Sequence, residues 1–275
     1  MEANVNTPIL VTGGTGRLGR HVVARLRDAG REVRVLSRKG QTSADGIEFV
    51  RGDLHKGDGI EAAVDGAAII VHLAGGAKGD DEATRNLVRA ASGAGPQHVV
   101  YVSVVGSNSV PVVSGIDRAM FGYFASKLAA EQVVADSGIP WSTLRATQFY
   151  DLMLLVVHAM ARLPVIPVPS GVRFQPVDER EVADRLVELA LGTPQGLVPD
   201  IGGPRVYTMA DLVRTYLRAS GKHRLLLPIP MPGNAARAVR AGAILTPGRA
   251  VGHRSWEEFL AERLSSRGDV GPVAA

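Results

Sequence analysis

The most constraining stretch of the chain is a glycine-rich turn near its start. Residues 12–19 read Thr-Gly-Gly-Thr-Gly-Arg-Leu-Gly, after an apolar run at 9–11 and before a helical pattern with one apolar face. The order of strand, turn and helix predicts a dinucleotide site, because the first turn of such a helix offers unpaired N–H groups and partial positive charge to a pyrophosphate. An ordinary tight turn is the alternative, since the chain has 32 glycines.

Three glycines of this turn are expected to have separate tasks. Gly14 is expected to let the chain turn sharply, Gly16 to let the backbone approach the pyrophosphate, and Gly19 to let the helix lie close to the strand. The predicted phosphate-binding residues are Gly13, Thr15, Gly16, Arg17, Leu18 and Gly19.

The end of the second predicted strand, residues 32–36, bears on the choice between NAD and NADP. In NAD-selective proteins an acidic residue near this point binds the ribose hydroxyls. Here Ser37 is followed by Arg38 and Lys39, and Arg17 lies inside the glycine turn. Because cations suit a 2′-phosphate, the sequence predicts NADP, with Ser37 and Arg38 among its ligands. Alternatively, Arg38 and Lys39 are charges of an ordinary loop.

Two further strand ends supply predicted cofactor contacts. Residues 47–51 read as a strand, and Asp53 and Leu54 follow it. Asp53 is expected to accept a bond from an adenine amino group, to cap the helix predicted at 59–64, or both. The apolar run at 67–73 predicts a strand buried on both faces. The small Ala74 and Gly75 after it leave room for a cofactor.

A tyrosine and a lysine lie one turn apart on a helix predicted over residues 117–136. Tyr123 and Lys127 are four residues apart, so they share a face. A nearby ammonium would lower the pKa of the phenol, which could then exchange a proton with a substrate oxygen. As an alternative, Lys127 forms a surface ion pair with Glu131, four residues further on.

The remaining pattern alternates strands and helices and predicts a doubly wound α/β fold. Strands are expected at 98–102, which ends at Ser103, at 139–147 and at 197–201, and helices at 81–94, 149–163, 180–191, 209–220 and 255–264. Asp178 is the expected N-cap of the helix at 180–191. Two proline-rich stretches, 164–169 and 228–233, read as extended connections. Residues 1–147 are assigned to a dinucleotide-binding core, and 148–275 to a segment that completes the sheet and forms the substrate pocket, within one compact unit.

Composition excludes several classes of function. The chain has no cysteine, so disulfides and thiolate catalysis are impossible, and we expect no metal site. The start is short and polar, and no apolar stretch approaches bilayer-spanning length, so a cytoplasmic protein without a membrane partner is expected. The net charge is +4 without a block of like charges, which argues against nucleic acid. The basic segment after Asp200 is read as a solvated surface.

Together these motifs resemble the short-chain dehydrogenase/reductase superfamily, and more narrowly its atypical, NmrA-like branch. The resemblance spans nearly the whole chain. It implies a Rossmann-type sheet of six or seven parallel strands, a nicotinamide cofactor and a small C-terminal substrate-binding region. It also implies that Tyr123 is the general acid/base and that Lys127 lowers the pKa of Tyr123 and holds the nicotinamide ribose. Ser103 or Ser107 would polarise the substrate oxygen, although neither aligns cleanly with the family's serine.

The expected function is therefore an NADP-dependent oxidoreductase that reduces a carbonyl or an activated double bond of a small, mostly apolar molecule. Because several atypical members of the superfamily have lost the catalytic set, the alternative is a non-catalytic NADP-sensing regulator or scaffold that binds a protein partner. The substrate itself, the direction of the reaction and the oligomeric state are open, and a homodimer is compatible with the sequence.

Overall fold

The computed structural model describes residues 7–43, 46–76 and 79–268. The strands are β1 (Ile9–Thr12), β2 (Val33–Ser37), β3 (Ile47–Arg51), β4 (Ile69–His72), β5 (His98–Val104), β6 (Trp141–Ala146), β7 (Val165–Pro169), β8 (Arg173–Phe174), β9 (Gly196–Leu197), β10 (Tyr207–Thr208) and β11 (Leu225–Ile229). The helices are α1 (Arg17–Asp28), α2 (Ile60–Val64), α3 (Asp80–Ala94), α4 (Gly115–Ala135), α5 (Tyr150–Met160), α6 (Glu179–Leu191), α7 (Met209–Ala219), α8 (Asn234–Ala241) and α9 (Trp256–Gly268), with a 3-10 turn at Pro247–Arg249.

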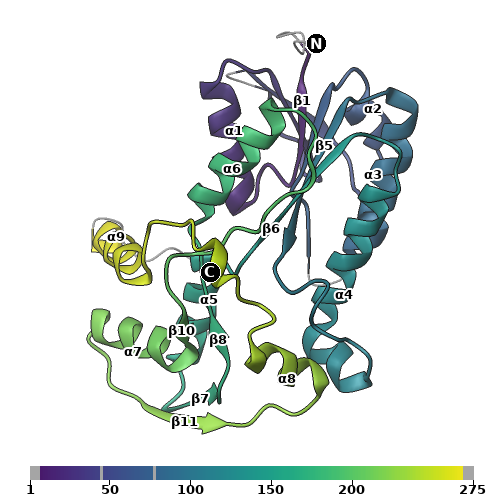
Figure 1. Ribbon diagram of the computed structural model, residues 1–275. Helices are drawn as coiled ribbons and strands as arrows, with labels where there is room; N and C mark the ends of the chain where they lie inside the picture. Colours follow the sequence, from purple (N-terminus) through teal and green to yellow (C-terminus); the bar gives the residue numbers. More distant parts are fainter. Residues whose placement is uncertain (1–6, 44–45, 77–78, 269–275) are drawn as a thin grey trace.

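Seven parallel strands form the central sheet, in the order β3-β2-β1-β4-β5-β6-β9. Helices α1 and α6 cover one face, and α2, α3 and α4 cover the other (Figure 1). This confirms the predicted doubly wound Rossmann-type fold. The strand order reverses between β1 and β4, and the crevice at the carboxyl ends of these strands is where such sheets bind ligands.

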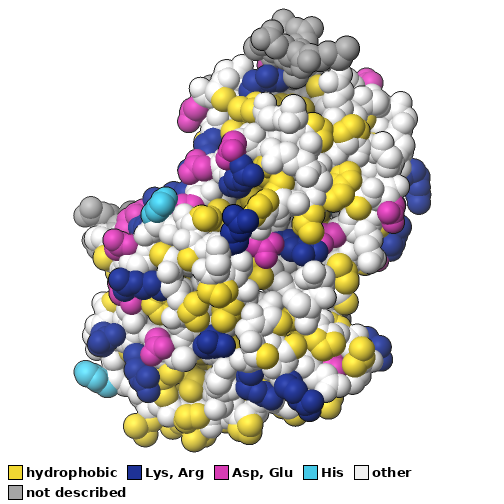
Figure 2. Space-filling view, in the orientation of Figure 1, with side chains coloured by type: hydrophobic (Ala, Val, Ile, Leu, Met, Phe, Trp, Pro, Cys, Tyr) yellow, Lys and Arg dark blue, Asp and Glu magenta, His cyan; other side chains and the backbone are white. Residues whose placement is uncertain are grey.

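The second half of the chain contributes to two regions. Helix α6 and strand β9 return to the central sheet, whereas α5, α7, α8, α9 and the short strands β7, β8, β10 and β11 form a lobe at its lower end (Figure 1). Within this lobe Tyr150, Trp256 and Phe259 stack on one another, with ring centroids 5.2 to 5.7 Å apart. Viewed in Figure 2, apolar side chains gather at the lower tip of this lobe, with Lys and Arg side chains around them.

Most differences from the predicted elements lie in this lobe. Both proline-rich stretches were expected to be connections, but β7 and β11 take in residues of each and pair in parallel, from Leu225 opposite Val165 to Ile229 opposite Pro169. A proline lacks a backbone N–H donor but leaves the N–H groups of its neighbours free to bond, so a short two-stranded sheet can still form. Helix α8 was not predicted, and the strand expected over 197–201 is reduced to β9.

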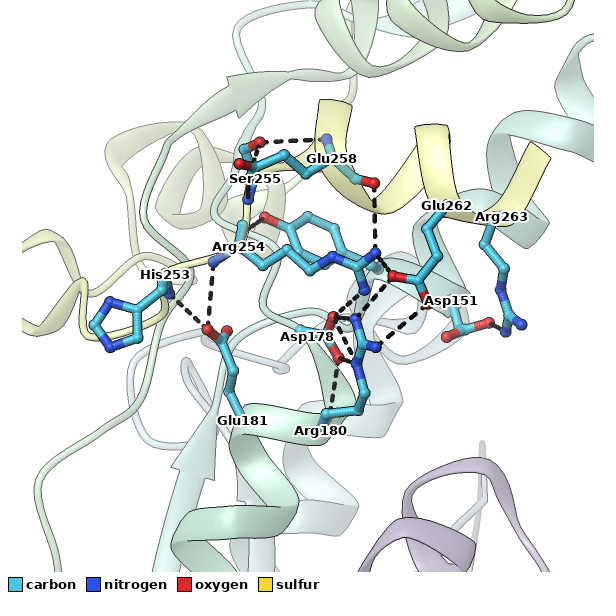
Figure 3. Close-up of polar contacts among 11 residues, drawn as sticks. Asp151, Asp178, Arg180, Glu181, His253, Arg254, Ser255, Glu258, Glu262 and Arg263 are labelled. Atoms are coloured by element: carbon cyan, nitrogen blue, oxygen red, sulfur yellow. Dashed lines mark hydrogen bonds and ion pairs between the residues drawn. The ribbon is translucent and has the colours of Figure 1, made fainter. Parts of the chain in front are cut away.

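A charged cluster fastens the C-terminal helix to the rest of the chain (Figure 3). Asp178 caps α6, as predicted, by accepting a hydrogen bond from the Arg180 N–H at 2.8 Å. Its carboxylate also pairs with the guanidinium groups of Arg180 and Arg254, each at 2.8 Å. Both arginines reach Glu262 on α9. Because Asp178 is buried, this network fixes the position of α9 over the start of α6.

Candidate functional site

A cavity of about 410 Å³ lies at the carboxyl ends of β1, β2 and β4, where the strand order reverses. Nine predicted cofactor ligands line it: Gly13, Thr15, Gly16, Ser37, Arg38, Asp53, Leu54, Ala74 and Gly75. Its remaining walls include His55 and Asp80, which the sequence reasoning did not single out. Leu18 and Lys127 line a second, adjoining cavity instead, and Arg17 and Gly19 line neither.

The glycine turn packs too closely against neighbouring backbone to hold side chains at Gly13 and Gly19. Gly13, not Gly14, has the left-handed backbone, with φ of 71°, and a Cβ there would lie 2.7 Å from the Ala74 nitrogen. Gly14 does not have the backbone of a sharp turn that was expected of it; a Cβ there would instead lie 2.9 Å from Val35 Cγ1, so Gly14 allows close packing on β2. A Cβ on Gly19 would lie 2.1 Å from the Gly13 carbonyl oxygen, in agreement with the close approach expected of that glycine.

The start of α1 suits an anionic group. Its N-cap is Gly16, which has no side chain to bond the first N–H groups, and no acidic residue lies in the first turn. These N–H groups and the helix dipole favour a pyrophosphate in the cavity that Thr15 and Gly16 line. Arg17 does not line this cavity. Burial and Asp151 raise the pKa of Glu179 to about 7, and the nearby charge of Arg17 opposes this rise.

Of the three cations that the sequence offers for a 2′-phosphate, Arg17, Arg38 and Lys39, Arg38 is the one that lines this cavity. Arg38 is exposed and lines the cavity, whereas Lys39 does not. Arg51 and Lys56 share a neighbouring hollow with Arg38, and the sequence reasoning had not selected them. Asp53 does not cap α2, whose N-cap is Gly59. Its Oδ1 accepts a hydrogen bond from the His55 N–H at 2.9 Å.

The second cavity, of about 540 Å³, adjoins the first, because Leu73, Gly75 and Gly76 line both. Its walls come from the ends of β5 and β6, from α4 and α5, and from the C-terminal lobe. They are mainly apolar and include Met120, Phe121, Phe124, Phe149, Leu152, Val172, Phe174, Met231, Val239 and Ile244. The polar side chains among its walls are Ser103, Tyr123, Lys127, Thr147 and Gln148.

Lys127 is held by three oxygen atoms at the floor of this cavity. Its Nζ lies 3.1 Å from Asp80 Oδ2 in an ion pair, and 3.2 Å each from the Tyr101 hydroxyl and the Val102 carbonyl, to which it donates hydrogen bonds. Burial lowers the pKa of Lys127, and the Asp80 carboxylate opposes this shift. The alternative of a surface ion pair with Glu131 is therefore wrong, because Lys127 is buried and pairs with Asp80.

A buried histidine supports this floor from below. His72 bonds the Thr12 hydroxyl at 2.6 Å and the Thr84 hydroxyl at 3.0 Å, and its ring stacks on Tyr101 with centroids 5.3 Å apart. Burial lowers the pKa of His72 to about 3, so the ring is neutral at physiological pH. Its position inside a buried strand gave no sequence signal of this role.

Tyr123 lies on the wall of the apolar cavity, as its helical spacing from Lys127 predicts. Its pKa is not lowered, however: burial, with a smaller contribution from the Asp80 carboxylate, raises the pKa of Tyr123 to about 12. The expected effect of Lys127 is absent because the Asp80 carboxylate compensates the ammonium charge. The phenol is therefore protonated throughout the physiological range.

Both candidate serines donate their protons to one carboxylate. Ser103 Oγ and Ser107 Oγ each bond Glu131 Oε1, the latter at 2.8 Å. Arg145 clamps the same carboxylate with its Nε and Nη2 atoms. Ser103 lines the apolar cavity and Ser107 does not. In this arrangement neither hydroxyl has a proton left with which to polarise a substrate oxygen.

The other polar groups of the cavity wall are also occupied. Thr147 Oγ1 donates to the Gln175 carbonyl, and the Gln148 side chain donates to the Ile244 carbonyl at 3.2 Å and accepts from the Gln175 N–H at 3.2 Å. Among the described residues, Tyr123 thus has the one hydroxyl on this wall without a hydrogen-bond partner. The Tyr123 hydroxyl is therefore the group of this wall that can give a proton to a bound molecule.

Known proteins resemble the chain in sequence and in fold. A family profile described as NAD(P)H-binding matches residues 13–153. The (4-alkanoyl-5-oxo-2,5-dihydrofuran-3-yl)methyl phosphate reductase of Streptomyces griseus is 30% identical over 220 residues, which cover 78% of this chain and 74% of that protein. The ceramide reductase of Caulobacter vibrioides is 26% identical over 265 residues, or 89% and 79% of the two chains.

A solved structure shares the fold over nearly the whole chain. The NADPH-dependent quinone oxidoreductase QOR2 of Escherichia coli, complexed with NADPH, superposes with a TM-score of 0.78. The two proteins are 18% identical, and the match covers 93% of this chain and 99% of that one.

Proposed function

Because the chain belongs to the NAD(P)H-binding family, we propose that it is an NADP-dependent reductase with Tyr123 as the proton donor. Its substrate is a small, uncharged, mostly apolar molecule that carries a carbonyl or an activated double bond. The observation that carries the proposal is the free Tyr123 hydroxyl in an apolar cavity that adjoins the crevice of the sheet. Two relatives named as reductases agree with this class of reaction.

The residues around the first cavity fit a dinucleotide. The uncapped start of α1 leaves free N–H groups for a pyrophosphate in the cavity that Thr15 and Gly16 line, and Arg38 would meet a 2′-phosphate. Gly75 is also without space for a side chain, because a Cβ there would lie 3.1 Å from both Lys127 Nζ and Asp80 Oδ2. Gly75 and Lys127 would hold the nicotinamide end.

In the proposed reaction NADPH, when bound, supplies the hydride. Tyr123 gives its proton to the substrate atom that gains negative charge. With a pKa of about 12 the phenol is in its acid form at every physiological pH, as a proton donor must be. Lys127 keeps a positive charge beside the reacting region, fixed in position by Asp80. The mainly apolar walls make the surroundings of these groups less polar than water and so strengthen these interactions.

The charges of the second cavity limit the class of substrate. Among the described residues that line it, Lys127 is the one Lys or Arg, and its charge is already paired with Asp80. A phosphate group, which the relative from Streptomyces griseus has in the name of its substrate, would find no free cation among these described lining residues. Burying an uncompensated anion is costly. We therefore expect uncharged ketones, aldehydes, quinones or enones to be reduced, and phosphorylated analogues to be poor substrates.

Replacing Tyr123 with Phe tests the proposal. The Tyr123→Phe variant removes the hydroxyl and keeps the ring, so NADPH affinity, followed by fluorescence titration, is expected to stay within about twofold. Turnover of any accepted substrate is expected to fall by about a hundredfold or more. Tyr207→Phe, outside both cavities, is the matched control and should keep full turnover. Full activity of Tyr123→Phe would show that another group supplies the proton.

One observation favours a second candidate, a non-catalytic NADP sensor. Since both serines give their protons to Glu131, no second hydroxyl among the described wall residues is left beside Tyr123 to polarise a substrate oxygen. A screen of uncharged carbonyl compounds with NADPH, followed at the absorbance of the reduced cofactor, separates the two functions. A sensor would bind NADPH with micromolar affinity and oxidise it with none of them.

A further inference from the structure

The small parallel sheet of β7 and β11 is apolar on both of its faces. Inward-pointing Ile166 and Val168 belong to the core of the C-terminal lobe. On the outward face, Leu225, Leu227 and Ile229 alternate along β11 and are 73%, 54% and 40% exposed. A sheet that faces water ordinarily carries polar residues on that side. On the outward face of β11 these positions are leucine and isoleucine instead.

The pairing of the two strands joins these residues into one surface. Leu225 lies opposite Val165, and Leu227 lies opposite Pro167. Val165 is 44% exposed, as is Leu163 just before β7. We call this surface the apolar strip; it consists of Leu163, Val165, Pro167, Leu225, Leu227 and Ile229. A contiguous exposed apolar surface of this kind marks an interaction site.

Cations surround the apolar strip, and carboxylates are nearly absent from the segments that build it. Arg162, His223 and Arg224 line a surface hollow of about 430 Å³ together with Leu225. Between residues 212 and 256 the chain carries eight Lys or Arg and no Asp or Glu, and residues 152–177 also contain no acid. Among the described residues no carboxylate pairs with Arg162, Lys222 or Arg224. Figure 2 shows the resulting arrangement at the lower tip.

We propose that the apolar strip docks on a lipid bilayer rich in anionic phospholipids. Its leucine, isoleucine and valine side chains would enter the boundary between headgroups and acyl chains, while Arg162, Lys222 and Arg224 meet the lipid phosphates. Apolar area and positive charge on the same face are the two features that such binding needs.

A second copy of the chain is the less favoured occupant. Strand pairing between copies needs free N–H groups along an edge, and Pro167, Pro169 and Pro228 have none. The positive charge around the apolar strip would also repel its own copy. The expectation of no membrane partner rested on the absence of a spanning segment. Among the described residues no helix is long and apolar enough to cross a bilayer, and surface docking does not require one.

Docking there would place the substrate cavity next to the lipid. Pro169, the last residue of β7, and Met231, shortly after β11, both line that cavity. An apolar substrate dissolved in the bilayer could then enter with little exposure to water. This consequence rests on the proposed function, whereas the docking itself does not, because it can be measured without cofactor or substrate.

Vesicle co-sedimentation of the full chain tests the docking. Vesicles of phosphatidylcholine alone and of phosphatidylcholine with phosphatidylglycerol are compared at low and high salt. The wild type is expected to bind the anionic vesicles, and to lose most of this binding in phosphatidylcholine or high salt. Arg224→Glu should weaken binding at least about fivefold, and Leu227→Asp at least about tenfold. Arg89→Glu and Leu191→Asp, exposed positions on α3 and α6, are the matched controls and should bind as the wild type does.

NADPH titration of each variant checks that the chain still folds, and also separates this proposal from the proposed function. Loss of vesicle binding with unchanged NADPH affinity supports the docking. No binding of the wild type to anionic vesicles would overturn it, as would equal binding of Leu227→Asp and Leu191→Asp. A wild-type dimer in solution that Leu227→Asp converts to a monomer would also overturn it, by assigning the apolar strip to contact between copies.

Discussion

The ion pair of Lys127 and Asp80 allows one prediction to be worked out in detail. The side chains of Lys127 and Asp80 are 6% and 2% exposed, and Nζ lies 3.1 Å from Oδ2. Replacing Asp80 with Asn keeps the shape of the side chain and its Oδ1 acceptor, to which the Gly76 N–H donates at 2.7 Å. The change therefore removes one negative charge and little else.

The expected cost follows from the burial of the charge that stays behind. Breaking a buried ion pair by removing one partner costs about 3–5 kcal/mol, because the other charge is left uncompensated away from water. Asp80→Asn should lower the free energy of unfolding by this amount near neutral pH. Asp81, the next residue on α3, pairs with Arg85 at the surface. Asp81→Asn should cost less than about 1 kcal/mol.

The pH dependence of this cost has a definite sign. Burial already lowers the pKa of Lys127 from 10.5, and Asp80 opposes the shift, so the variant lowers this pKa further. At pH values between the pKa of Lys127 in the folded variant and 10.5, its value in the unfolded chain, the unfolded variant binds more protons than the folded one. Stability of the variant therefore rises with pH across that window. The difference in the free energy of unfolding between the wild type and Asp80→Asn should therefore become smaller as the pH rises into the alkaline range.

Urea unfolding followed by circular dichroism, at neutral and at alkaline pH, measures these differences. The double variant Asp80→Asn with Lys127→Met should be more stable than Asp80→Asn alone, because it no longer buries an unpaired ammonium. The reasoning is refuted if Asp80→Asn and Asp81→Asn unfold at the same urea concentration, or if the deficit of Asp80→Asn grows with pH.

Two further predictions concern the cofactor and the proton. Arg38→Ala should weaken NADPH binding by about ten to a hundredfold, as expected for a charged hydrogen bond, while NADH affinity stays within about twofold. Lys39→Ala, outside the cavity, is its control, and equal weakening of both cofactors by Arg38→Ala would remove Arg38 from the 2′-phosphate site. Since the acid form of Tyr123 is present below a pKa of about 12, kcat/KM for reduction should show no alkaline decline from this group between neutral pH and about pH 10. A decline near pH 7 that Tyr123→Phe abolishes would contradict the raised pKa.

Much of the fold could be predicted because its signals are local. The glycine turn, the apolar run at 67–73 and the helical periodicities are each readable within a few residues, and they account for the central sheet and most of its helices. The same locality explains why nine predicted cofactor residues line one cavity. In a parallel sheet the carboxyl ends of the strands meet at one edge, so residues just after each strand come together.

The partners of the buried charges could not be predicted, because they come from elements far apart in the chain. Helical spacing placed Glu131 four residues after Lys127, and proximity in sequence favoured that pair. In the fold Lys127 turns to Asp80 on α3, and Glu131 turns to Arg145 on β6. Each charge thus finds its partner on a neighbouring element, and the Glu131 carboxylate that Lys127 leaves free takes the protons of both serines. The pairing of four charges across three elements therefore determines which hydroxyls of the cavity wall are occupied, and the proposed role of Tyr123 as proton donor follows from its being left unpaired among the described wall residues.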